Sequence, residues 1–321
     1  MKNILKYISL LFLGAAAVSC DFEDMPFDKY DSDFVFSNDK KAEGYVLGVY
    51  LGLPFDKSDE NGYNRVDGAM LASASDEAMI TVPGSSIVFL TDGSLTPRKS
   101  NPDGCWENNY KFIRDANIGI VGLEKLPEAN HDLKLQLQAE LKFLKAFFYF
   151  ELVKRYGGVP LIDRAYELSD DLNVPRSSFA ACVDYIAGLC DESYTDLPAP
   201  NNVNFGRASK GAALALKARL LLYAASPLNA TNALDAMTWE EAYQINKEAL
   251  ASLRENSYEL YKTCKNPSEY DVFATKGQVK WKKGSDAAAA MHEYFCSTLS
   301  YDANPNDKET IWQDRGARGD M

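Results

Sequence analysis

Several aromatic, amide and guanidinium side chains fall outside the stretches with helical periodicity, where a ligand could reach them. They are Tyr63, Asn64, Phe89, Arg98, Asn101 and Trp281. Aromatic rings pack against apolar faces of a ligand, and amide and guanidinium groups hydrogen-bond to its polar edges, so residues of these types could bind a ligand. No motif fixes these positions residue by residue, and the alternative for each is an ordinary loop residue.

The sequence carries no motif for covalent or metal-assisted catalysis. It contains no G-x-S-x-G, P-loop or dinucleotide-binding fingerprint. Its two histidines, His131 and His292, are isolated, and no C-x-x-C or H-E-x-x-H spacing indicates a transition metal. Asp76 and Glu77 are adjacent, but neighbours on a helix diverge by about 100° and do not face one site. The motifs therefore give no support for an enzyme of these classes, and we expect no cofactor, with calcium left open.

The first residues have the pattern of an export signal. A positively charged start precedes an apolar segment over residues 8–17 that is too short to span a bilayer, and small residues lead to Cys20. This pattern resembles the lipobox of bacterial lipoproteins, and a plain signal cleaved nearby is the alternative. We expect a signal peptide over residues 1–19, lipid attachment at Cys20, and a lipidated acidic tether over residues 20–36.

The acidic composition limits the partners of the rest of the chain. A formal net charge of −12 and a pI of about 4.8 argue against a nucleic-acid partner, which would need clustered Lys and Arg. No later apolar run reaches a transmembrane length. Cys182 and Cys190 are expected to share a helix about 12 Å apart, too far for a disulfide, and to be buried as small hydrophobic side chains.

Most of the body has helical periodicity, so the predicted fold class is mainly α. Helices are expected over about residues 39–53, 66–78, 106–126, 133–156, 177–195, 208–225 and 238–255. Ser37 and Asn38 are both candidate N-caps, and Thr238 with Glu241 forms a capping-box motif. The segment between the second and third helices is expected to be a long irregular loop with a short hairpin around residues 87–90. Consecutive antiparallel helices predict a tetratricopeptide-like hairpin array.

Aromatic residues at helical spacing are expected to belong to the hydrophobic core. These residues are Trp106, Tyr110, Phe147, Tyr149 and Tyr156. The expected end of the long helix lies at the glycine pair 157–158, because glycine readily adopts the left-handed conformation that ends helices.

At these helices the sequence resembles the SusD/RagB family of outer-membrane nutrient-binding lipoproteins. The blocks that carry the resemblance are W-x-x-x-Y-x-x-I-x-x-x-N from Trp106, AELKFLKAFFYFELVKRYGGVPL, VPRSSFAACVDYIAGLCDESYTDLP, FGRASKGAALALKARLLLYAASP and NDKETIWQDR. Lys145 stands where the family favours arginine. The resemblance also implies that recognition groups lie in the loop before the W-x-x-x-Y helix, which contains Arg98 and Asn101.

The resemblance implies a surface-exposed lipoprotein of the cell outer membrane. It implies that residues 37–321 form a SusD-like helical domain whose C-terminal lobe is missing, because family members usually continue well beyond a segment like ETIW. It further implies non-catalytic capture of a nutrient polymer or oligomer, most often a glycan, for a TonB-dependent transporter of the SusC type.

Two other classes of function compete with glycan capture. A helical scaffold would bind a protein partner without recognising a glycan, and its surface would be polar and poor in aromatic residues. A glycosidase would need two carboxylates at a fixed separation in a deep cleft. Exposed aromatic side chains in loops would favour glycan capture over both.

Overall fold

The computed structural model describes residues 32–53, 65–67, 69–96, 102–167, 169–171, 173–199, 206–229, 237–256 and 258–260. Its α-helices are α2 (Ser32–Val35), α3 (Asp39–Tyr50), α4 (Val88–Thr91), α5 (Trp106–Gly122), α6 (His131–Tyr156), α7 (Phe179–Asp196), α8 (Lys210–Ala224) and α9 (Trp239–Glu255). The 3₁₀ helices are η1 (Leu71–Ala74), η2 (Leu123–Lys125) and η3 (Glu128–Asn130). The strands β1 (Arg65–Val66) and β2 (Ala69–Met70) form a two-stranded antiparallel sheet.

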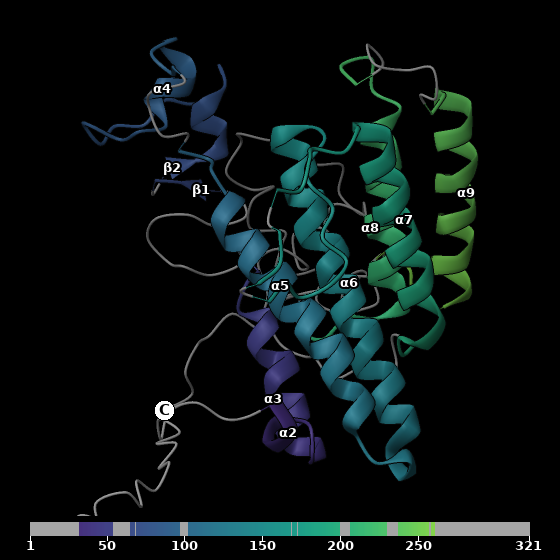
Figure 1. Ribbon diagram of the computed structural model, residues 1–321. Helices are drawn as coiled ribbons and strands as arrows, with labels where there is room; N and C mark the ends of the chain where they lie inside the picture. The colour runs from purple at the N-terminus through teal and green to yellow at the C-terminus, as the bar shows by residue number, and fades with distance from the viewer. Residues whose placement is uncertain are drawn as a thin grey trace, which may run out of the picture.

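The long helices form an array in which each packs against the next. Successive contacts join α5 to α6, α6 to α7, α7 to α8 and α8 to α9, and α3 lies against both α5 and α6. Figure 1 shows α9 at the outer end of this array and α4 with the two strands in a small lobe apart from it. The predicted mainly helical class and hairpin array are confirmed.

Side-chain caps define where several helices begin. Asn38, one of the two expected caps, accepts a hydrogen bond from a backbone N–H in the first turn of α3, and Ser178 does the same for α7. At α9 the Thr238 side chain accepts from the N–H of Glu241, whose carboxylate accepts in return from the N–H of Thr238, so the capping box is confirmed. Gly157 ends α6 with a φ of 70°, a conformation that glycine adopts without steric cost.

Helix α6 lies at the centre of the hydrophobic core. Its fully buried large side chains are Leu137, Leu141, Phe143, Leu144, Phe148, Tyr149, Phe150 and Leu152. A helix with buried residues on several sides must be covered by several partners, and here α3 and α5 cover one side while α7 and α8 cover another. Cys182 and Cys190 are buried free thiols in this core, as expected.

Glycines allow close approach where the early helices meet the core. A Cβ at Gly119 of α5 would lie 2.6 Å from Cδ1 of Leu141 and 2.8 Å from the Tyr45 ring. A Cβ at Gly122 would lie 2.2 Å from the ring of Phe36, which is 1% exposed.

The tether was expected to extend to residue 36, but α2 and Phe36 belong to the folded body.

The small lobe differs from its sequence-based expectation. The helix predicted over residues 66–78 is wrong, because β1, β2 and η1 occupy that stretch. Asp67 lies in the turn between the strands with a φ of 50°, and its carboxylate accepts a hydrogen bond of 2.5 Å from the N–H of Ser86. The hairpin predicted around residues 87–90 is also wrong, because α4 forms there and the fully buried Ile87 packs against the strands.

Candidate functional site

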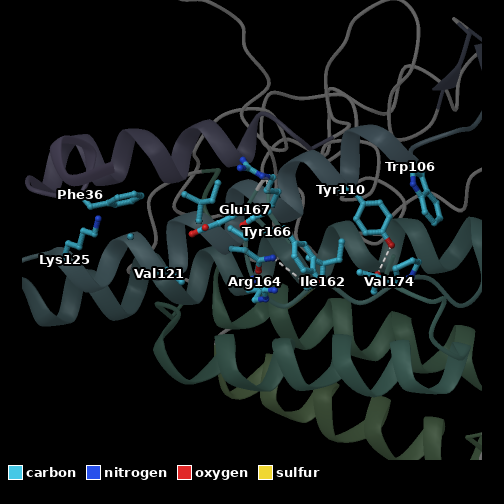
Figure 2. Close-up of a pocket in the computed structure, with 17 residues that line it drawn as sticks. Phe36, Trp106, Tyr110, Val121, Lys125, Ile162, Arg164, Tyr166, Glu167 and Val174 are labelled. Carbon is cyan, nitrogen blue, oxygen red and sulfur yellow. Dashed lines mark hydrogen bonds between the residues drawn. The ribbon is translucent and has the colours of Figure 1, made fainter. Parts of the chain in front are cut away.

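A pocket of about 1200 Å³ lies between one face of α5 and the segment that joins α6 to α7. From α5 it is lined by Trp106, Tyr110, Arg114, Asn117, Ile118, Val121 and Gly122. From the joining segment it is lined by Pro160, Ile162, Arg164, Ala165, Tyr166, Glu167, Ser169 and Val174. Figure 2 shows Trp106 and Tyr110 at one end of this α5 pocket and Phe36 with Lys125 at the other.

The first end of the α5 pocket is aromatic. The Trp106 side chain is 40% exposed, and its ring centre lies 4.9 Å from that of Tyr110 and 5.2 Å from that of Tyr156. The Tyr110 hydroxyl donates a hydrogen bond of 2.7 Å to the carbonyl of Pro160. Burial raises the pKa of Tyr110 above its usual value, so the hydroxyl stays protonated and remains a donor. These contacts hold the rings in place while part of the Trp106 face meets solvent.

Charged side chains line the middle and the far end of the pocket. The Arg164 guanidinium lies 2.8 Å from the Asp170 carboxylate and 4.5 Å from the centre of the Tyr166 ring. The hydrogen bond from Arg164 lowers the pKa of Asp170. Lys125 forms an ion pair with Asp33. Arg114 is exposed and forms no hydrogen bond or ion pair with the residues that the structure describes.

A buried hydrogen-bond network fixes the wall that faces α5. The N–H of Ile162 donates to the Tyr149 hydroxyl at 2.7 Å, and the Ile162 carbonyl accepts from Tyr149 at 3.2 Å and from the Asn117 amide at 3.2 Å. The Lys145 ammonium in turn donates to the Asn117 side-chain oxygen at 2.6 Å. Residues of α5 and α6 therefore position the first part of the joining segment.

Lys145 is the charged member of this network, and its side chain is buried. The residue is 3% exposed, and its ammonium nitrogen lies 5.4 Å from the centre of the Tyr185 ring. Burial lowers the pKa of Lys145 from 10.5 to about 8, although the negative charges of Asp163 and Glu192 favour the protonated form. The pocket wall thus depends on a hydrogen bond from an ammonium group whose pKa, about 8, lies well below that of an ordinary lysine.

Phe89 is the one ligand-binding candidate expected from sequence that the structure describes, and it does not line this pocket. It lies half-buried in α4 of the small lobe. The other candidates, which lie outside the described residues, are Cys20, Tyr63, Asn64, Arg98, Asn101 and Trp281. Lipid attachment at Cys20 and ligand binding by the other residues therefore stay predictions.

The residues at the aromatic end of the pocket were expected from their helical spacing to lie in the core. Phe147 and Tyr149 are buried as expected, whereas Trp106 is exposed and the prediction for it is wrong. Tyr110 and Tyr156 are half-buried. Trp106, Tyr110 and Arg114 follow one another at spacings of four residues, so they share a face of α5, and this pattern was a signal for the site.

The described residues offer neither a metal cluster nor a membrane span. Within them, no group of three or more His, Cys, Asp or Glu side chains is arranged to hold a metal ion. No helix in the same part of the chain combines the length and the apolar character needed to cross a bilayer.

Two curated proteins share sequence with this chain. The starch-binding protein SusD of Bacteroides thetaiotaomicron is 28% identical over an alignment of 294 residues, and the match covers 82% of this chain and 48% of that protein. A SusD-like protein of Formosa agariphila is 33% identical over 136 residues, which are 42% of this chain and 26% of that protein. The chain therefore spans less than half the length of either relative.

A solved structure and a family model match as well. A SusD-like protein from Bacteroides fragilis superimposes with a TM-score of 0.56 at 27% identity, covering 75% of this chain and 42% of that one. The family model described as "starch-binding associating with outer membrane" matches residues 55–222. Since this match covers more than half of the sequence, the chain belongs to the SusD-like family.

Proposed function

We propose that this protein captures a nutrient glycan and delivers it to a TonB-dependent transporter of the SusC type, without acting on it as an enzyme. The observation that carries the proposal is the match of residues 55–222 to a family described as starch-binding and associated with the outer membrane. The α5 pocket supplies suitable chemistry, because it combines the exposed ring of Trp106 and the half-buried ring of Tyr110 with guanidinium and carboxylate groups.

The proposed glycan site is the aromatic end of the α5 pocket. A sugar ring would pack on the exposed face of Trp106, with Tyr110 beside it, and hydroxyl groups would meet the polar side chains along α5. The stretch with Arg98 and Asn101 directly precedes Trp106 in the chain, so we retain both as proposed contacts. Phe89, Tyr63, Asn64 and Trp281 are retained as further proposed contacts.

Trp106→Ala is expected to weaken glycan binding at least about tenfold, because a partly exposed aromatic anchor in a pocket typically carries much of the binding energy. Calorimetry of the chain from residue 21 onward against a panel of polysaccharides measures the effect. Trp239→Ala is the matched control, since Trp239 is 55% exposed on α9 and does not line the pocket. Circular dichroism must show that both variants fold.

Two results would count against this proposal. Equal affinities of the Trp106 and Trp239 variants would move the glycan site away from the α5 pocket. A folded wild-type protein that binds no glycan of the panel would contradict glycan capture and favour a helical scaffold that binds a protein partner.

The proposed location is the outer membrane, with the protein held by acyl chains on Cys20 and exposed at the cell surface. Acyl chains contribute about 0.8 kcal/mol per buried CH₂, so two or more of them give stable anchoring. Cys20→Ala is expected to move the protein from the washed membrane fraction to the soluble fraction, as measured by fractionation and immunoblotting. Retention of the variant in washed membranes would contradict the lipid anchor as the main attachment.

A further inference from the structure

The α5 pocket is elongated, and its chemistry changes along its length. From Trp106 to Val121 it follows α5 for about 22 Å, at a rise of about 1.5 Å per residue. The aromatic rings lie at the start of this path, and Arg114 follows one helical turn after Tyr110 on the same face. The pocket is therefore long enough for several linked sugar rings, which would meet first aromatic and then cationic side chains.

The charge of the pocket contrasts with that of the whole protein. Its lining contains the cations Arg114, Lys125 and Arg164 and the carboxylate of Glu167, whereas the chain has a formal net charge of −12. Arg164 pairs with Asp170, and Lys125 pairs with a carboxylate outside the lining. The exposed Arg114 forms no ion pair within the described residues, although its charge also acts on the carboxylate of the neighbouring Asp115.

An arginine in this setting selects for a particular kind of ligand. Its guanidinium group is planar, always charged and presents paired N–H donors that match the two oxygens of a carboxylate. A hydroxyl group of a neutral sugar satisfies one donor at a time and brings no charge, so it gains less from this position than a carboxylate does.

We infer that the α5 pocket takes an acidic oligosaccharide, with one sugar ring on Trp106 and Tyr110 and the carboxylate of a following uronic acid on Arg114. This inference rests on the proposed function, because it names the class of glycan that the same site would capture. The aromatic end supplies affinity for any sugar ring, and Arg114 supplies the preference for the charged one.

The test compares acidic glycans with their own neutral forms. The probes are oligogalacturonate, oligoalginate and hyaluronan oligosaccharides, each beside its carboxyl-reduced counterpart, titrated by calorimetry into the chain from residue 21 onward. For at least one pair we expect the acidic form to bind about tenfold tighter. Arg114→Gln should remove this preference and leave the affinity for the reduced form unchanged, whereas Trp106→Ala should weaken both forms alike. Arg254→Gln, an exposed substitution on α9, is the matched control.

The possible outcomes separate this inference from the proposed function. Equal binding of the reduced and acidic forms in every pair, or a preference for the acidic form that persists in Arg114→Gln, would overturn the acidic class and leave glycan capture standing. Failure of the folded protein to bind either acidic or neutral glycans would overturn both.

Discussion

Replacing Arg207 with methionine is expected to lower the free energy of unfolding by about 3–5 kcal/mol, because the change leaves a buried carboxylate without its counter-charge. Glu140 in α6 is 0% exposed, and one of its oxygens lies 2.8 Å from Nε of Arg207. The same oxygen accepts a hydrogen bond of 2.8 Å from the hydroxyl of Tyr50, which itself accepts from the N–H of Ala208 at 2.9 Å. This network joins α3, α6 and the start of α8.

Urea unfolding followed by circular dichroism measures this loss. Arg254→Met is the matched control and should change the unfolding free energy by less than about 0.5 kcal/mol, because Arg254 is exposed on α9. The double variant Arg207→Met with Glu140→Met should recover most of the stability, since an apolar pair of similar volume carries no unpaired charge. If Arg207→Met were no more destabilising than the control, the network would not be a structural link between the three helices.

Raising the pH from about 7 to about 9.5 is expected to stabilise the wild-type protein by about 2 kcal/mol relative to Lys145→Met. Burial lowers the pKa of Lys145 from 10.5 to about 8, so between these values the unfolded chain binds more protons at this site than the folded chain. The free energy of unfolding therefore rises with pH across that window. Below about pH 8 both states carry the charge, and the full cost of burying it remains.

Other side chains also titrate over the same pH range. The contribution of Lys145 is therefore obtained from the difference in unfolding free energy between the wild type and Lys145→Met. Urea unfolding at several pH values measures it, with Lys247→Met on the exposed face of α9 as the control. If the free energies of unfolding of the wild type and of Lys145→Met changed with pH in parallel, the lowered pKa of Lys145 would be contradicted. Lys145→Arg should also lack the effect, since arginine stays protonated throughout, and arginine is what the resembled family favours at this position.

The long helices could be predicted from the sequence because local signals and tertiary packing agree in them. Apolar periodicity placed α3 and α5 to α9, and side-chain caps marked the first residues of some of them, such as Asn38 for α3 and Thr238 for α9. The small lobe gave no comparable signal. Its strands are two residues long and depend on the Asp67 turn and on contacts with Ile87, which lies far from them in sequence.

The site was harder to predict than the fold. Helical spacing indicates which residues share one face of a helix, but it does not indicate which segment of the chain packs on that face. Trp106, Tyr110 and Arg114 were recognisable as neighbours on α5, but their exposure depends on the path of residues 160–174. That path is fixed by buried contacts from Tyr149 and Asn117 to Ile162, which no sequence pattern encodes. Trp106 and Tyr110 were therefore expected in the core, whereas the structure places them at one end of the α5 pocket.

The central position of α6 has a consequence for the order in which the chain gains stability during synthesis. Domains tend to fold from the N-terminus as the chain emerges, at about 5–20 residues per second. Here α3 and α5 pack mainly on α6, which ends at Tyr156. Until that residue has emerged, the apolar faces of the earlier helices lack their main partner. The first half of the chain must therefore be kept from aggregation before it can fold.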